Sequence, residues 1–212
     1  EERRQALVDK ARELDIPLVE DNPYGDLRFE GEAPLPLAAR NPEGVLYMGS
    51  FSKVLAPGLR LGFVVAPKSV YGKLVQTKQA ADLHTPSFNQ RVAAEVMKDG
   101  FLDRHIPTIR TLYKNQRDAM LAALDQEMVG LGVSWTRPVG GMFLWVQLPE
   151  GMDAQKLLPL AVERGMAFVP GAPFFPGNPQ HNCLRLSYVT VPPAQIAQGI
   201  AALAAAIKAY AQ

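Results

Sequence analysis

The sequence predicts an α/β protein in which a mixed, mostly parallel sheet covered by helices precedes a small α+β domain. Three observations lead to this prediction. The first part of the chain alternates amphipathic helical patterns with short apolar runs, which are typical of buried strands. Polar residues directly follow two of these runs, at the strand ends where open α/β sheets bind ligands. Further along, strand-like runs come in pairs with helical patterns between them, as in a compact α+β unit.

Length and composition narrow the class of protein. The 212 residues are 48% hydrophobic and 20% charged, which is enough to build the core of one or two domains. The net charge is only +1, so the charge gives no reason to expect nucleic acid or an anionic membrane surface as a partner. No apolar run approaches the ~20 residues of a membrane span. The single cysteine, Cys183, excludes a disulfide framework and fits a reducing compartment such as the cytoplasm.

The first helix and the first strand follow from simple patterns. Residues 1–14 carry apolar side chains at helical spacing, with acidic residues in the first turn, and Pro17 ends this helix. The run 16–20 is predicted to form a short strand that delivers Asp21 at its C-terminal end. The segment 22–44 is polar and rich in proline and glycine, and it is predicted to be a loop.

Two more strands are predicted over residues 45–49 and 61–66, the first of them ending at Ser50. The connection after Ser50 is too short for a parallel crossover, so this pair is expected to be antiparallel. The long connection 22–44 allows a parallel crossover between the strands on either side of it. Asp21 and Ser50 therefore both follow strands of one mixed sheet.

Helices are predicted to follow this sheet. A capping box, Ser87-x-x-Gln90, is expected to begin one of them, and Pro107 is expected to break or kink the chain before the last. The predicted helices are 69–82, 87–98 and 108–128. The last one is interpreted as an inter-domain helix, which divides the chain into a large-domain part, a linking helix and a small domain. The expected ranges are 1–107, 108–128 and 129–212.

The small domain is predicted to contain two helices and four short strands. Val133–Thr136 and Met142–Leu148 are expected to be strands joined by a Pro-Val-Gly-Gly turn. The other predicted strands are 167–169 and 184–189, and the predicted helices are 153–164 and 193–210. Strands paired with helices on one face make a compact α+β unit.

The chemistry-bearing residues gather after the strand 45–49. Ser50 and Ser52 supply hydroxyls, Lys53 supplies an amine, and Arg60 supplies a guanidinium. Hydroxyls and arginine suit a phosphate, whereas a sheltered amine suits a carbonyl carbon. One ligand that carries both groups is pyridoxal 5'-phosphate. For Ser52, a role as a local backbone cap is an alternative interpretation.

Four stretches give the chain a family resemblance. They are Glu-Asp-Asn-Pro-Tyr at 20–24, Gly-Ser-Phe-Ser-Lys-x6-Arg-x-Gly at 49–62, Gly-Gly-Met-Phe at 140–143 and Leu-Arg-Leu at 184–186. In this order and spacing, the chain resembles the fold type I pyridoxal-phosphate-dependent aminotransferases of class I/II over essentially all of its length. The motif Asp-Asn-Pro-Tyr-Gly-Asp-Leu at 21–27 is most similar to the branch of the family that includes aromatic, 2-aminoadipate and kynurenine aminotransferases.

The resemblance implies a role for each polar residue. Lys53 would form the Schiff base with the cofactor and carry a proton once substrate displaces it. Asp21 would pair with the pyridine nitrogen, and Tyr24 would hydrogen-bond the 3'-oxygen of the ring. The cofactor phosphate would be held by Ser50, Ser52 and Arg60.

The resemblance also implies substrates and an assembly. Arg185 would bind the α-carboxylate of an amino acid or a 2-oxo acid, although a structural salt bridge is the alternative. Met142 or Phe143 would line the side-chain pocket, with core packing as an equal alternative. A homodimer is implied, with residues 84–89 facing the neighbouring subunit. The three histidines show no metal-ligand spacing, so no metal is predicted.

Two further expectations complete the interpretation. The chain begins on Glu1, without a methionine and inside a helical pattern, so we expect it to be the C-terminal half of a longer enzyme and poorly active by itself. The alternatives to transamination are another fold type I reaction, such as β-elimination or decarboxylation, and the aminotransferase-like sensor domain of a transcriptional regulator.

Overall fold

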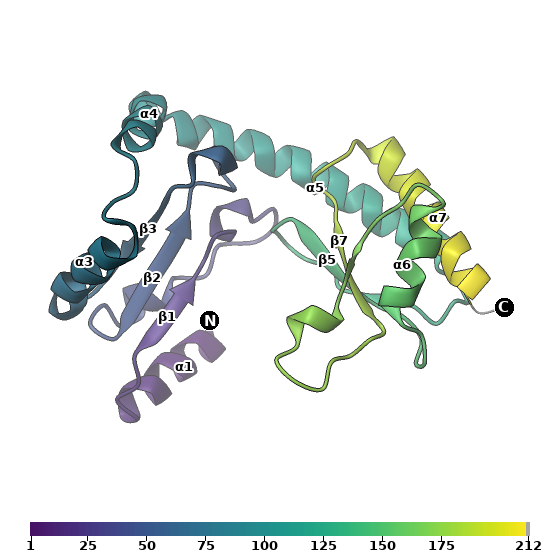
Figure 1. Ribbon diagram of the computed structural model, residues 1–212, viewed down its shortest axis with the longest axis horizontal. Coiled ribbons are helices and arrows are strands. Elements are labelled where there is room, and N and C mark those ends of the chain that lie inside the picture. The colour runs from purple at the N-terminus through teal and green to yellow at the C-terminus, as the bar shows by residue number, and fades with distance from the viewer. Residues whose placement is uncertain (211–212) are drawn as a thin grey trace. The chain divides into compact units, whose positions relative to one another are not determined.

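The computed structural model describes residues 1–210. The chain divides into two compact units, residues 1–108 and residues 109–212 (Figure 1). The long helix α5, Phe101–Glu127, begins in the first unit and continues in the second. Within the described residues, no helix is long and apolar enough to cross a membrane.

The first unit contains a three-stranded mixed sheet in the order β1-β2-β3. Its strands are β1 Leu18–Asp21, β2 Val45–Ser50 and β3 Gly62–Val65. Strands β1 and β2 are parallel, whereas β2 and β3 are antiparallel, so both predicted strand directions are confirmed. The predicted α/β fold class is confirmed as well.

Helices cover one face of this sheet. Helix α1, Glu2–Glu13, and the short helix α2, Leu37–Arg40, bury Val8, Leu37 and Val45 in one apolar cluster. On the opposite face Val19 is 61% and Val64 49% exposed. The sheet is thus covered on the face of α1 and α2, whereas these two valines on the other face stay exposed within residues 1–210. Helix α2 lies in the segment that was predicted to be a loop, because four residues are too few to show a helical period.

The helices that follow the sheet correct two details of the prediction. Helix α3, Lys68–Asp82, precedes α4, Ser87–Met97, whose N-cap is Pro86. The predicted capping box is wrong, since Ser87 already lies inside α4 and the Gln90 side chain donates to the Thr85 carbonyl at 2.8 Å. Of the two outcomes predicted at Pro107, a break or a kink, the break does not occur: α5 begins at Phe101 and runs through the proline, which removes one backbone donor without ending the helix.

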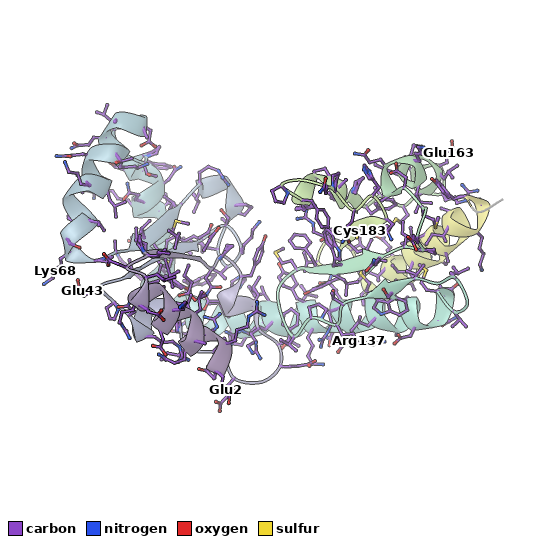
Figure 2. The ribbon with its side chains drawn as sticks, turned by 90° about the horizontal axis from the view of Figure 1, so that it is seen from below. Glu2, Glu43, Lys68, Arg137, Glu163 and Cys183 are labelled. Atoms are coloured by element: carbon purple, nitrogen blue, oxygen red, sulfur yellow. The ribbon has the colours of Figure 1, made fainter. Side chains whose placement is uncertain are left out.

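The second unit contains a four-stranded antiparallel sheet in the order β4-β5-β7-β6. Its strands are β4 Ser134–Trp135, β5 Phe143–Gln147, β6 Val169–Pro170 and β7 Cys183–Ser187. Its other helices are α6 Ala154–Val162 and α7 Pro193–Tyr210, and the bounds of α7 are those predicted. Cys183 is a buried free thiol inside this unit (Figure 2).

The two faces of this second sheet differ in polarity. Leu144, Val146, Leu184 and Leu186 point to one face and are at most 2% exposed. Buried residues of α5, α6 and α7 complete the core on that side, and Figure 1 draws these helices beside the sheet. Because side chains alternate along a strand, Arg185 projects to the other face. The polar side chain of Arg185 therefore lies on the face of the sheet that is opposite to the core.

Candidate functional site

Two predicted polar residues lie at the C-terminal ends of neighbouring strands. Asp21 is the last residue of β1, and Ser50 is the last residue of β2. Asp21 pairs with Met48, which precedes Ser50 by two positions, so the Asp21 and Ser50 side chains project to the same face of the sheet. This is the face opposite to α1 and α2. The Asp21 carboxylate is exposed and makes no hydrogen bond or ion pair to residues 1–210.

A tight turn presents Lys53 directly after β2. The carbonyl of Phe51 accepts hydrogen bonds from the amides of Leu55, at 2.9 Å, and Ala56, at 3.1 Å. The Lys53 Nζ atom lies 5.7 Å from the centroid of the Tyr24 ring. This ring contact is the only interaction of the Lys53 amine with the described part of the chain. The amine is therefore half-buried without a carboxylate neighbour.

The predicted phosphate-binding residues surround this turn. The Ser50 Oγ atom accepts a hydrogen bond from the Ser52 amide at 3.1 Å, so the local cap is formed by Ser50 and not by Ser52. Arg60 follows a short 3-10 helix, Pro57–Leu59, and its side chain donates to the Pro57 carbonyl at 3.1 Å. Its backbone is left-handed, with φ 54° and ψ 41°. The rest of the guanidinium is exposed to solvent.

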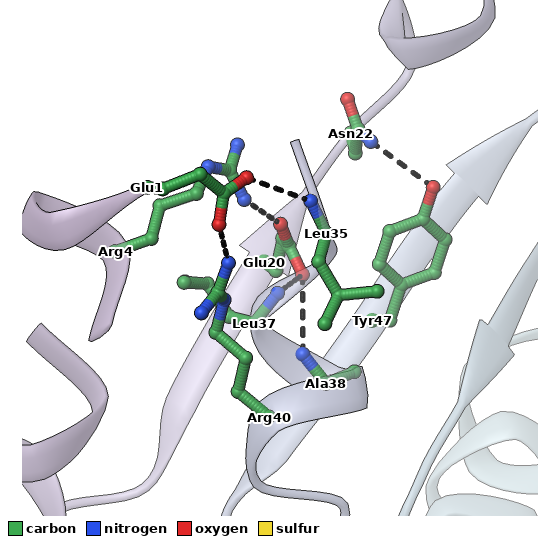
Figure 3. A network of polar contacts seen from close by, with 9 residues as sticks. All are labelled: Glu1, Arg4, Glu20, Asn22, Leu35, Leu37, Ala38, Arg40 and Tyr47. Atoms are coloured by element: carbon green, nitrogen blue, oxygen red, sulfur yellow. Dashed lines mark hydrogen bonds and ion pairs between the residues drawn. The ribbon is translucent and has the colours of Figure 1, made fainter. Parts of the chain in front are cut away.

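A buried carboxylate that sequence reasoning missed anchors this strand end. Glu20 is 8% exposed and accepts hydrogen bonds from Arg4 at 2.8 Å and from the amide of Leu37 at 2.7 Å (Figure 3). It thereby ties β1 to both α1 and α2, one residue before Asp21. The sequence offered one sign of this role: side chains alternate between the two faces of a strand, so Glu20 points away from Asp21 and towards the helices.

A second polar pair lies at the same strand end. The Asn22 side chain donates to the Tyr47 hydroxyl at 3.1 Å (Figure 3). Both residues line a cavity of about 420 Å³ that also borders Gly49 and Ser50. Lys53 does not line this cavity, and Asp21 borders a different one of about 770 Å³ next to Arg28. The candidate site is therefore defined by the chemistry of Asp21, Ser50 and Lys53, because neither of these two cavities is lined by both Asp21 and Lys53.

The second unit presents Arg185 from the middle of β7. Arg185 pairs with Trp145 of β5 on one side and with Val169 of β6 on the other. Its guanidinium carbon lies 4.1 Å from the ring centroid of Phe143 and 5.0 Å from that of Phe174. Among the described residues it has no carboxylate partner. The structural salt bridge considered as an alternative is thus not present there.

A buried tyrosine holds the loop that leads into β5. The Tyr188 hydroxyl donates to the Gly140 carbonyl at 3.1 Å, and the guanidinium of Arg117 donates to the Pro138 carbonyl at 2.5 Å. Burial raises the pKa of Tyr188 far above its ordinary value, against the opposing charge of Arg117, so the hydroxyl stays a donor at neutral pH. These bonds shape the turn before Phe143.

The histidines contribute no comparable chemistry. His105 stacks on Phe101 with ring centroids 5.1 Å apart, and an imidazole nitrogen of His84 lies 3.1 Å from the Thr85 carbonyl. No group of histidine, cysteine, aspartate or glutamate within residues 1–210 is arranged to hold a metal ion.

Comparisons with known proteins show which family the chain resembles. The model of the family "Aminotransferase class I and II" matches residues 1–203. The chain is 47% identical over 209 residues to aromatic-amino-acid aminotransferase 1 of Thermococcus litoralis, covering 98% of the chain and 50% of that relative. It is 47% identical over 210 residues to 2-aminoadipate transaminase of Thermus thermophilus, covering 97% of the chain and 52% of that relative.

A solved structure supports the same relationship. The alpha-aminoadipate aminotransferase from Thermus thermophilus, in a complex with N-(5'-phosphopyridoxyl)-L-leucine, matches with a TM-score of 0.91 and 46% identity. The match covers 98% of this chain and 54% of that one. The chain thus spans about half the length of the relatives that it matches. With a family model that matches nearly all of its residues, the chain belongs to the aminotransferase class I and II family.

Proposed function

We propose that the protein carrying this chain is a pyridoxal-phosphate-dependent aminotransferase, which moves an amino group between an amino acid and a 2-oxo acid. The observation that carries the proposal is the family match over residues 1–203. The matched residues include the Lys53 amine, which has no carboxylate partner within residues 1–210, and the strand-end residues Asp21 and Ser50. A relative solved with a phosphopyridoxyl–amino acid adduct supports the same cofactor.

The donor set of the first unit fits this cofactor. Pyridoxal phosphate needs an amine for its aldehyde, an acid for its ring nitrogen and donors for its phosphate, and Lys53, Asp21 and Arg60 supply one group of each kind. When bound, the cofactor supplies a carbonyl that accepts an amino group and a ring that stabilises negative charge at the substrate Cα.

Lys53 and Asp21 would handle the protons. The Lys53 amine has no carboxylate beside it within residues 1–210, so it is available as a nucleophile and then as a proton carrier at the substrate Cα. The Asp21 carboxylate would hold a proton on the ring nitrogen. Its placement at a strand end, with Glu20 anchored behind it, supports this role.

The remaining residues of the first unit would orient the cofactor. The Ser50 and Ser52 hydroxyls and the Arg60 guanidinium would bind phosphate oxygens, with Arg60 able to bind two at once. The Tyr24 hydroxyl would donate to the 3'-oxygen of the ring. The proximity of the Tyr24 ring to Lys53 Nζ, at 5.7 Å, supports a shared task for these two residues.

In the second unit, Arg185 would bind the substrate carboxylate. A guanidinium without a protein acceptor is suited to a planar, bidentate anion, and a carboxylate is one. The names of the relatives at 47% identity support amino acids with aromatic or acidic side chains as substrates. We include in the proposal a homodimer that works in the cytoplasm, as the resemblance implies.

The half-reactions of transamination provide the test. The cofactor absorbance of the native protein is expected to change when an amino acid is added alone, and to return when a 2-oxo acid follows. The second step must yield one new amino acid for each 2-oxo acid consumed. Release of ammonia or carbon dioxide without any need for a 2-oxo acid would show elimination or decarboxylation instead. No change with any amino acid would favour the sensor-domain alternative.

A further inference from the structure

We propose that Phe143 and Phe174 form an aromatic clamp that positions the Arg185 guanidinium for carboxylate binding. The inference rests on the proposed role of Arg185 and adds two positioning residues to it. The guanidinium carbon lies 4.1 Å from one ring centroid and 5.0 Å from the other, and both distances fall within the ~6 Å of a cation–π contact. A long, flexible side chain is thereby restrained by two rigid ones.

The sheet places the first ring. Phe143 begins β5 and pairs with Ser187, which lies two positions after Arg185 on β7. Because side chains two apart on a strand share a face, Phe143 and Arg185 are diagonal neighbours on one surface of the sheet. The turn before β5 is held by the Tyr188 hydroxyl, which fixes where this strand begins.

A close backbone approach places the second ring. Phe174 ends a short 3-10 helix, Ala172–Phe174, that follows Gly171. The Gly171 amide donates to the Cys183 carbonyl at 2.7 Å, and a Cβ atom at Gly171 would meet the Cys183 side chain at 2.7 Å. Only glycine therefore allows the segment to lie this close to β7. Trp145 and Phe174 then meet edge to face, with centroids 5.7 Å apart and planes at 82°.

The clamp leaves the binding edge of the arginine available. Cation–π contacts use the faces of the two rings, whereas the five N–H donors of a guanidinium lie in its own plane. Within residues 1–210 no protein acceptor takes these donors. The guanidinium is therefore oriented by contacts that do not compete with a carboxylate, which lowers the entropy lost when the carboxylate binds.

Sequence reasoning did not predict the contact of Arg185 with Phe143 and did not consider Phe174. The expectation that Phe143 lines a side-chain pocket or packs in the core stays a prediction, and its contact with the arginine adds to it. Phe174 lies 50% exposed on a loop eleven positions before Arg185, and no periodic pattern connects the two. Only the tertiary structure brings this ring to the guanidinium.

The test compares two ligands of nearly the same shape, one with a charged carboxylate and one with a neutral amide in its place. The native protein is titrated with 3-phenylpropionate and with its uncharged amide, 3-phenylpropanamide, neither of which has an amino group to react. Phe174→Leu and Phe143→Leu are each expected to weaken carboxylate binding about fivefold and to leave amide binding unchanged. Phe174→Tyr keeps an aromatic face and is expected to restore carboxylate binding.

Two further variants separate the clamp from the role of Arg185 itself. Phe175→Leu is the matched control, since the centroid of this neighbouring ring lies 6.3 Å from that of Trp145 and, within residues 1–210, the ring makes no cation–π contact with Arg185. It should leave the ratio of the two affinities unchanged. Arg185→Leu should abolish the preference for the carboxylate, and a preference that survives this change contradicts the proposed role of Arg185. A preference lost with Arg185→Leu but intact in both phenylalanine variants overturns the clamp alone.

Discussion

Arg60 shows at the scale of one residue how the candidate site is held in an uncommon conformation. Its backbone is left-handed, a region that non-glycine residues visit at a cost of about 1–2 kcal/mol. The sequence places a glycine nearby, at Gly58, but Gly58 is not among the residues with positive φ. The conformation at Arg60 therefore could not be predicted from glycine positions. Strain of this kind concentrates at functional sites.

Two substitutions of Arg60 should separate stability from phosphate binding. Arg60→Gly relieves the left-handed strain, so we expect its free energy of unfolding to exceed that of Arg60→Ala by about 1 kcal/mol. Both variants lose the guanidinium and should bind inorganic phosphate and cofactor equally weakly. Urea unfolding and cofactor titration measure the two effects. Equal stability of the two variants would show that the backbone at residue 60 is not strained.

At the scale of elements, Glu20 connects a strand to two helices. One carboxylate oxygen accepts from Arg4 of α1, and the other accepts from the amides of Leu37 and Ala38 at the start of α2 (Figure 3). Arg40 of α2 in turn pairs with Glu1 and donates to Gln5 at 3.0 Å. The position of Asp21 thus depends on the packing of α1 and α2 behind β1.

Neutralising Glu20 should loosen this connection. Glu20→Gln keeps the shape of the side chain but removes the charge that Arg4 pairs with, and its amide group replaces one acceptor oxygen. We expect the free energy of unfolding to fall by about 1.5–3 kcal/mol, the range for hydrogen bonds to charged groups. Glu43→Gln is the matched control, because Glu43 is exposed (Figure 2). Equal urea midpoints for the two variants would refute an anchoring role for Glu20.

The elements also show how far the sequence could predict the fold. Helix α7 was predicted with its observed bounds, because an alanine-rich period follows a proline that begins the helix. The capping box at Ser87 was misassigned because Pro86 already occupies the N-cap. Helix α2 is too short to leave a pattern. Local rules therefore worked where a segment was long and periodic.

At the scale of the whole molecule, the proposed chemistry is divided between two compact units. The first unit carries Lys53, Asp21 and the proposed phosphate-binding residues, and the second carries Arg185. The sequence predicts these charged residues because their order along the chain is local information. It could not predict the contacts of Glu20 and Phe174, because these join residues that are distant in the sequence.

The two units also differ in how completely they bury apolar residues. All four residues of β3 are exposed, including Phe63 and Val65, whereas β7 buries three of its five residues. The chain spans about half the length of its relatives. Within the described residues, the strands of the second sheet are therefore better covered than β3 is.

The central claim, that Lys53 is the amine that binds the cofactor, has a direct measurement. The native protein is loaded with pyridoxal phosphate, reduced with borohydride, digested and analysed by mass spectrometry. We expect one pyridoxyl group per chain, on the peptide that contains Lys53, and its loss in Lys53→Ala. Other lysines, such as Lys78 in its ion pair with Asp82, should remain unmodified. A stoichiometric label on a different lysine, or an undiminished label in Lys53→Ala, would show that Lys53 is not the amine that binds the cofactor.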